Sequence, residues 1–473
     1  MTQIKQGNLG ELWRLSSPMM VSFFSMMLMI FVDRLFLSIY STEALNGAVQ
    51  ASTLGWVFIL SFVTMGAMSE VFVSQYNGAQ KYDQLGRPVW QMIWFSVGSI
   101  VFFFFLAFVA SWMIYDPITK PHEYDFFRIF MLFGPIFTLM TALGGFYIGR
   151  GKTKIMQWLG ILGNAINICL DPIFIFGIKG YFPSMGTKGA ALATGIGTFV
   201  EVVILAALFL RRQNREKYGT ANFAFCKDLF LKTLKVGLPP SVFVAVEIFA
   251  WAVFYHMMAQ ISPIHILVAS VVQSILLLFL FFGMGLEKGV IALVGNFIGA
   301  KMPDKVKKVL SSAIKLNLLF MLFASLFLLI KPSFLVDWFY SNPEALELTV
   351  DFSSIDLATV KYYTKLGLAM SLFYIFFENV RWAINGALTA AGDTMFLLVA
   401  GALSIWFFML IPTYFFVILP KANIDIAFYI WVFYAFAACA INYMRFLAGK
   451  WKQKELLKES EEIPIPVINN EIE

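Results

Sequence analysis

The chain has 473 residues, of which 59% are hydrophobic and only 14% are charged, whereas soluble domains are about 45–50% apolar and about 25% charged. This balance excludes a soluble enzyme, a disordered protein and a small disulfide-stabilised domain. The net charge of +6 is better explained by basic loops beside a membrane than by nucleic-acid binding. We therefore expect a polytopic membrane protein with no nucleic-acid partner.

Apolar runs of spanning length follow one another along the chain with short breaks. Because backbone groups in lipid need internal hydrogen bonds, and the runs do not alternate, we predict helices rather than barrel strands. Six predicted spans cover residues 12–40, 46–76, 88–114, 124–149, 154–178 and 187–211. Six more cover 230–258, 264–299, 305–331, 360–390, 395–419 and 424–449. The sequence thus predicts twelve transmembrane helices.

Lysine and arginine gather in the loops on one side of these spans. They lie near 150–154, 211–235 and 301–308 and in the tail from 450, whereas the loop around 340–358, on the other side, is acidic. Because positive loops stay in the cytoplasm, we expect a multi-pass protein of the plasma (bacterial inner) membrane with both termini cytoplasmic.

The second half of the sequence repeats the first. The stretch VFVSQYNGA at 71–79 matches ALVGNFIGA at 292–300, and the same offset pairs Pro18 with Pro239. Copies with an even number of spans are parallel. We predict an all-α fold with two pseudo-symmetric six-helix bundles around a central cleft: an N-lobe (1–220), a C-lobe (221–450) and a charged cytoplasmic tail (451–473). This organisation is typical of transporters.

Polar residues inside the first-half spans are candidates for a cation site, because charge in a span is costly. Asp33 interrupts the first run, and Asn164, Asn167 and Asp171 share one face of the fifth. Pro172 follows and frees a backbone carbonyl. Carboxylate, amide and carbonyl oxygens are hard donors suited to Na⁺, or to a proton relay. If the coupling ion is Na⁺ rather than H⁺, its expected ligands include Asp33 and Asp171.

The sixth span adds Thr194, Thr198 and Glu201 on one face. They either extend the cation site or make structural hydrogen bonds between helices. Glu70, Glu287 and Lys288 lie nearer the ends of their spans and are interpreted as interfacial groups.

A second acidic site is predicted in the other half. Glu247 shares a helix face with Trp251 and Tyr255 in the seventh span. A polar stripe runs along the tenth span and consists of Ser371, Tyr374, Glu378, Arg381 and Asn385. Two interpretations stay open: Glu378 is a proton or ligand carboxylate, or it pairs with Arg381 and braces the bundle.

These features together resemble the multidrug and toxic compound extrusion (MATE) family over residues 10–450. The matching stretches are VDRLFLSIYSTEALNGA at 32–48, SQYNGA at 74–79, GRGKTKIMQWLGILGNAINICLDPIFIFG at 149–177, GTKGAALAT at 186–194, GLPPSVFVAVE at 237–247, LVGNFIGA at 293–300 and NGALTAAGDT at 385–394. The resemblance implies a twelve-helix antiporter that expels organic cations in exchange for Na⁺ or H⁺.

The resemblance also assigns residues. It implies an N-lobe cation site made of Asp33, Asn167, Asp171 and Thr194, and it matches Glu247 to an acidic residue of the C-lobe. Two positions depart from the family pattern. Glu378 stands where many members carry aspartate, and Arg34 follows Asp33.

We therefore predict a cation-coupled efflux antiporter that needs no cofactor beyond its coupling ion, works as a monomer among membrane lipids and is not an enzyme. Phenylalanine- and methionine-rich faces would accept flat, drug-like aromatic cations. One alternative is a flippase for lipid-linked precursors, which would need a cationic cleft, whereas only Arg381 and Arg34 lie within spans. A less favoured alternative is an intramembrane enzyme, whose motifs HExxH, GxSxG and DDxxD are missing. The coupling ion and the substrate stay open.

Overall fold

The computed structural model describes residues 6–341, 356–454, 456 and 457. Throughout these residues the regular structure is helical, apart from an isolated bridge between Ile178 and Phe182. Eleven stretches of this described part are helices long and apolar enough to cross a membrane. The predicted all-α, polytopic fold is confirmed at this level.

The first half of the chain follows the predicted spans closely. Its long elements are α1 (Leu9–Tyr40), α2 (Thr42–Gly66), α3 (Met68–Gly78), α4 (Gly86–Phe105), α6 (Pro121–Leu132), α7 (Gly134–Gly149), α8 (Thr153–Phe176) and α9 (Thr187–Phe209). Shorter elements are η1 (Tyr82–Gln84), the π-helical η2 (Leu106–Ala110), α5 (Ser111–Ile114) and α10 (Arg212–Tyr218). The predicted second span is divided at Ala67 into α2 and α3. Asn8 and Ser41 cap α1 and α2 by accepting a hydrogen bond from a first-turn N–H.

The second half contains longer helices. They are α11 (Lys227–Ile261), α12 (Pro263–Gly299), α13 (Asp304–Ser325), α14 (Pro332–Ser341), α15 (Leu357–Ala390), α16 (Thr394–Ile405) and α18 (Ile424–Leu447). Short elements are η3 (Leu326–Ile330), η6 (Trp406–Leu410), α17 (Ile411–Thr413), η7 (Tyr414–Ile418) and η8 (Lys450–Gln453). Most of the predicted acidic loop at 340–358 and most of the tail lie outside the described residues.

The helix α15 matches the predicted span 360–390 but does not belong to the eleven. The polar stripe that made it a candidate for function also lowers its hydropathy. A helix of this kind crosses a membrane only where its polar face meets protein or water.

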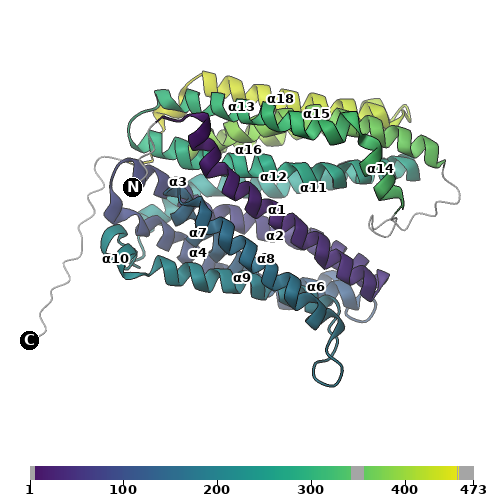
Figure 1. The fold of residues 1–473 in the computed structure, drawn as a ribbon, viewed down its shortest axis with the longest axis horizontal. Helices are drawn as coiled ribbons and strands as arrows, with labels where there is room; N and C mark the ends of the chain where they lie inside the picture. The colour runs from purple at the N-terminus through teal and green to yellow at the C-terminus, as the bar shows by residue number, and fades with distance from the viewer. Residues whose placement is uncertain (1–5, 342–355, 455, 458–473) are drawn as a thin grey trace, which may run out of the picture.

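The two halves of the chain form two groups of helices (Figure 1). The second-half helices, green to yellow, lie along one side, and most first-half helices, purple to teal, lie along the other. Helix α1 runs obliquely between the groups and contacts both α8 and α12, while α2 contacts α11. The N-terminus and α10 mark one end of the molecule, which also holds the loops 150–152 and 300–303. We call it the basic end.

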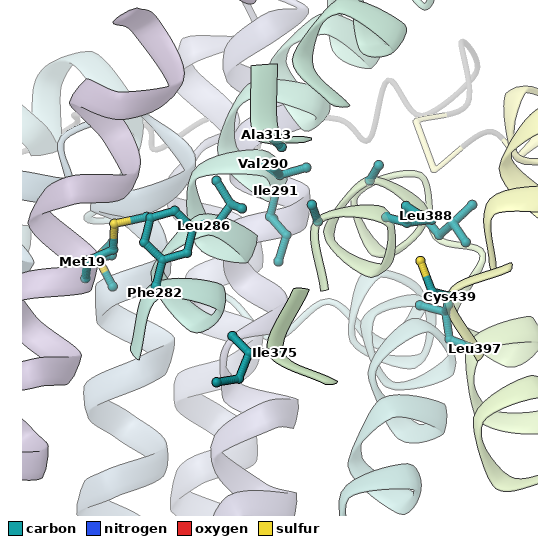
Figure 2. Packing of buried hydrophobic residues seen from close by; sticks show 14 of the residues in the cluster. Met19, Phe282, Leu286, Val290, Ile291, Ala313, Ile375, Leu388, Leu397 and Cys439 are labelled. Carbon is teal, nitrogen blue, oxygen red and sulfur yellow. The ribbon is translucent and has the colours of Figure 1, made fainter. Parts of the chain in front are cut away.

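The hydrophobic core divides unequally between the two ends. One large cluster spans both halves and includes Met19 of α1, Phe282 and Leu286 of α12 and Ile375 of α15 (Figure 2). Its first-half members come from helix segments near the basic end. A separate cluster contains only first-half residues, such as Phe127, from segments near the opposite end. Among the described residues, the halves therefore share a core at the basic end and not at the other.

The repeated motifs meet each other at the basic end. Asn77 donates a hydrogen bond from Nδ2 to Oδ1 of Asn296 at 2.6 Å, and Gln75 donates from Nε2 to the carbonyl of Ala390 at 2.7 Å. A Cβ on Gly78 would collide with the backbone of Asn296. The glycine therefore permits the close approach of α3 and α12 that joins the two halves.

Candidate functional site: two buried acidic sites

The first site lies where α1 packs against α8. The carboxyl groups of Asp33 and Asp171 are within hydrogen-bonding reach of each other, and Asp171 is fully buried. Neither oxygen of Asp171, nor Oδ1 of Asp33, accepts a hydrogen bond from a described residue. Two buried carboxylates so close together cannot both keep their charge unless a cation or a proton joins them.

Amide and hydroxyl groups complete this site. Asn167 donates from Nδ2 to Oγ1 of Thr194 at 3.2 Å, and Thr194 donates to the carbonyl of Ala190 at 3.0 Å. Oδ1 of Asn167 has no hydrogen-bond donor among the described residues. Asn167 and Asp171 are one helical turn apart on α8. We call Asp33, Asn167, Asp171 and Thr194 the paired-carboxylate site.

Two other predicted members lie farther away along the helices. Asn164 donates from Nδ2 to Oγ of Ser25 at 3.0 Å and so ties α8 to α1. Glu201 is buried against Gly163, which is eight residues, or about 12 Å, from Asp171 along α8. The structure therefore does not bring Glu201 into the paired-carboxylate site.

The paired-carboxylate site does not lie at the middle of its two helices. Asp33 lies seven residues before α1 ends at Tyr40, and Asp171 lies five residues before α8 ends at Phe176. Both carboxyl groups are therefore nearer the end opposite the basic loops than the middle of their spans.

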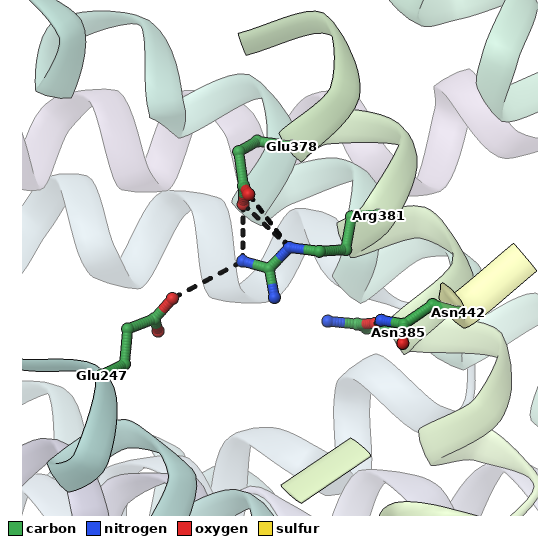
Figure 3. Close-up of polar contacts among 5 residues, drawn as sticks. All are labelled: Glu247, Glu378, Arg381, Asn385 and Asn442. Atoms are coloured by element: carbon green, nitrogen blue, oxygen red, sulfur yellow. Dashed lines mark hydrogen bonds and ion pairs between the residues drawn. The ribbon is translucent and has the colours of Figure 1, made fainter. Parts of the chain in front are cut away.

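The second site is centred on Arg381 of α15 (Figure 3). Nη2 of Arg381 lies 2.5 Å from Oε2 of Glu378, and its Nε donates to both carboxylate oxygens of Glu378 at 3.0 and 3.1 Å. Both residues are buried, each 2% exposed. Charge-assisted bonds of this fork geometry are strong. The predicted Glu378–Arg381 pair is thus present.

Glu247 reaches the same arginine from α11. Its Oε1 lies 3.5 Å from Nη2 of Arg381, and its side chain is 31% exposed (Figure 3). One arginine thus faces two glutamates, and Glu378 takes the closer contacts. We call Glu247, Glu378 and Arg381 the arginine-centred cluster; its surplus negative charge falls on Glu247.

Aromatic rings surround this cluster. Trp251 and Tyr255, on the face of α11 that carries Glu247, stack with ring centroids 6.3 Å apart. Tyr374 lies beside Trp431 of α18 at 6.3 Å. The hydroxyl of Tyr255 and Nε1 of Trp431 are buried without a hydrogen-bond partner among the described residues. One helical turn beyond Arg381, Oδ1 of Asn385 accepts a hydrogen bond from Nδ2 of Asn442 at 2.6 Å (Figure 3).

A third charged contact was not anticipated. Lys288 of α12 lies 2.6 Å from Oε1 of Glu70 of α3 and so links the two halves. Glu70, interpreted from the sequence as an interfacial group, is only 1% exposed and is buried where the halves meet. One feature of the sequence could have indicated this contact. Glu70 directly precedes the repeated stretch at 71–79, and this stretch joins the two halves.

A duplicated helical membrane bundle with buried charges between its helices defines a membrane transporter. The sequence pattern of the MatE family matches the chain in two blocks, residues 18–173 and 239–415, together more than half of its length. The blocks begin at the two prolines that the internal repeat pairs. The chain therefore belongs to the MATE family of multidrug efflux transporters and is a transporter, not an enzyme.

The names of similar proteins support this family membership. The chain is 23% identical over 466 residues to the probable multidrug resistance protein NorM of Thermotoga maritima, with 94% of each chain covered. It is 24% identical over 403 residues to the probable multidrug resistance protein NorM of Bacillus cereus, with 82% of this chain and 84% of the relative covered.

Solved structures show the same fold. A crystal structure of a MATE protein in complex with MaL6 matches with a TM-score of 0.83 at 16% identity, covering 95% of this chain and 98% of that one. An outward-facing MATE transporter matches with a TM-score of 0.81 at 17% identity, covering 95% and 97%.

Proposed function

We propose that this protein is an antiporter that exports organic, drug-like cations in exchange for an entering Na⁺ or H⁺. The observation that carries the proposal is the close pair of Asp33 and Asp171, in which three of the four carboxylate oxygens are buried without a hydrogen-bond donor in the described chain. Such a pair binds a small cation in one conformation of the transporter and releases it in the other. Asn167 supplies a further neutral oxygen to the same ion.

The proposal includes the finer architecture. The eleven apolar helical stretches and the polar helix α15 would make twelve spans, arranged as two six-helix bundles around a central cleft. The basic end would face the cytoplasm, since loops rich in lysine and arginine stay on that side. Both termini would then be cytoplasmic in a bacterial inner membrane, with a single chain as the working unit.

The arginine-centred cluster is the proposed site for the exported cation. Glu247 carries the surplus negative charge of the cluster and is partly exposed. The stacked rings of Trp251 and Tyr255 offer their faces beside it, and aromatic faces attract organic cations. The names of the relatives, which are multidrug resistance proteins, favour the same class of substrate.

Transport follows from two conformations with different affinities for the two ligands. The halves share a core and an ion pair at the basic end, whereas the opposite end has a separate first-half core. We assign this arrangement to the state that is closed at the basic end. The coupling ion would favour one state and the drug the other, as coupling requires.

A flippase for lipid-linked precursors is less well supported. A cleft for a polyanionic precursor needs unpaired positive charge, whereas Arg381 contacts two glutamates. Membership in the MATE family also favours export of cations.

The test is ethidium transport by the purified protein in lipid vesicles, driven by a Na⁺ gradient alone and then by a pH gradient alone. The gradient that drives uptake identifies the coupling ion. The variants Asp33→Asn and Asp171→Asn should each abolish this gradient-driven uptake. Asp228→Asn, an exposed residue in the first turn of α11, is the matched control. Gradient-driven transport by both site variants at the wild-type rate would refute the assignment.

A further inference from the structure

A basic cavity opens between α1 and the start of α8 at the basic end. It has a volume of about 260 Å³ and is lined by Arg14, Gly151, Lys152, Thr153, Lys154 and Ile155. Three of the six lining residues are cationic and none is acidic. The cavity lies far from both buried acidic sites, since Asp33 is nineteen residues beyond Arg14 on α1.

Among the described residues, the three cations of this cavity have no counter-ion. Some other basic side chains at this end do have an acidic partner, as Arg445 has in Asp393 at 2.7 Å and Arg212 has in Glu216 at 2.7 Å. Among the described residues, no ion pair or hydrogen bond of the Arg14, Lys152 or Lys154 side chain is found. Three positive charges that converge on one hollow attract an anion.

Thr153 and the start of α8 add hydrogen-bond donors. The side chain of Thr153 is 1% exposed, lines the cavity and makes no hydrogen bond with a described group. No side chain caps the first turn of α8. The N–H of Ile155 donates to the carbonyl of Lys152, whereas the N–H groups of Thr153 and Lys154 have no partner within the helix. A phosphate group satisfies hydroxyl, N–H and ammonium donors together.

Exposed tryptophans place this cavity at the depth of lipid headgroups. Trp13 precedes Arg14 and is 48% exposed, and Trp158 is 67% exposed, about 7 Å along α8 from Thr153. Tryptophan gathers at the boundary between headgroups and acyl chains. Basic pockets between helices at this depth bind anionic headgroups.

We propose that this cavity is a binding site for the phosphate headgroup of an anionic phospholipid. The headgroup contacts Arg14, Lys152, Lys154 and the Thr153 hydroxyl, and the acyl chains lie against the outer faces of α1 and α8. These are the two helices that carry Asp33 and Asp171. The bound lipid therefore fixes the relative position of their basic ends.

The test measures lipid binding by the purified full-length protein in detergent, and so it does not depend on transport. Phosphatidylglycerol and phosphatidylcholine are titrated separately, and native mass spectrometry counts the lipids retained. The variants are Arg14→Gln/Lys152→Gln/Lys154→Gln and Thr153→Val. The matched control is Arg215→Gln/Lys307→Gln/Lys308→Gln, which removes equal charge from exposed positions at the same end.

We expect one retained phosphatidylglycerol for which the wild type has at least tenfold higher affinity than for phosphatidylcholine. The triple cavity variant should lose at least about tenfold in affinity, because each basic residue near an anionic surface contributes to the attraction. Thr153→Val should lose about threefold, as for one hydrogen bond. The control triple should bind like the wild type.

Three results would overturn the proposal. Equal binding of the two lipids excludes a headgroup site, and an equal loss in the control triple reduces the effect to overall charge. The third result concerns the melting temperature of the purified protein. If inorganic phosphate raises it as much as phosphatidylglycerol does, and adding the lipid to the phosphate raises it no further, the cavity binds a free anion instead.

Discussion

The two buried acidic sites contain the same chemical group in opposite surroundings. At the paired-carboxylate site, Asp33 and Asp171 face each other, and three of their four oxygens lack a donor within the described chain. At the arginine-centred cluster, Glu378 is held by three contacts to Arg381, at 2.5 to 3.1 Å. The first site is incomplete without a cation, whereas in the second Arg381 already compensates the charge of Glu378 and leaves that of Glu247 in surplus.

This difference indicates that the two halves of the duplicated fold have different functions. The internal repeat aligns Asp33 with Phe254 and Glu378 with Phe137, so the copies share packing positions and not charges. A carboxylate with a fixed arginine is a poor carrier of protons, because the arginine keeps it ionised. We therefore assign ion coupling to the first half and cation recognition to the second.

The largest expected effect breaks the arginine-centred cluster. Arg381→Met leaves the buried Glu378 beside Glu247 without a counter-ion, and the loss of one partner from a buried ion pair costs about 3–5 kcal/mol. The melting temperature in detergent should fall sharply, and the double variant Glu378→Gln/Arg381→Met should recover most of it. Arg215→Met, at an exposed position, is the control. An unchanged melting temperature of Arg381→Met would show that Arg381 is not needed to compensate the charge of Glu378.

The next effect contrasts the two sites by the same change from carboxylate to amide. Asp171→Asn removes a charge that has no donor, so the melting temperature should hold or rise, while ion-coupled transport is abolished. Glu378→Gln should instead lower the melting temperature, because Arg381 loses its nearest partner. Equal shifts in both variants would remove the distinction between the sites.

A smaller effect is expected at the contact between the halves. Lys288→Gln leaves Glu70 buried without its 2.6 Å partner and so favours separation of the basic end. The reporter is Ser74→Cys, placed in a chain whose three native cysteines are replaced by alanine, and position 74 is buried in this interface. With Lys288→Gln, this cysteine should react several-fold faster with a membrane-permeant maleimide than it does in the chain that keeps Lys288. Lys307→Gln is the control. An unchanged labelling rate would mean that the ion pair does not hold the halves together.

The smallest effect on stability is expected at Glu247. Its side chain is 31% exposed and makes one contact at 3.5 Å, so Glu247→Gln should cost less than about 1 kcal/mol. Ethidium binding, measured by fluorescence polarisation, should nevertheless weaken several-fold because the cluster loses its surplus charge. Unchanged ethidium affinity would move the drug site elsewhere.

Much of the fold was predictable because the lipid bilayer restricts which structures can cross it. Lipid forces continuous apolar helices, so the runs around α1, α8 and α12 could be placed from composition alone. Asp33 and Asp171 were predictable as well, since a carboxylate in such a run is rare unless it functions. The i, i+3 spacing of Glu378 and Arg381 made their pair a stated alternative.

The remainder depends on contacts between distant segments. The approach of Glu247 to Arg381 requires the packing of α11 against its neighbours, and no local pattern encodes it. The Glu70–Lys288 pair joins residues of different halves, and their positions near span ends suggested solvent instead. The division of the second predicted span at Ala67 and the π-helical turns η2, η3, η6 and η7 were not predicted from the sequence.

The most direct test of the central claim is release of the coupling ion when the drug binds. Purified protein is loaded with radioactive Na⁺ or equilibrated in weak buffer for proton detection, and saturating ethidium is added. Wild type and the control Asp228→Asn should release the ion, whereas Asp171→Asn should release none. Release from Asp171→Asn at the wild-type level would contradict the assignment of coupling to the paired carboxylates.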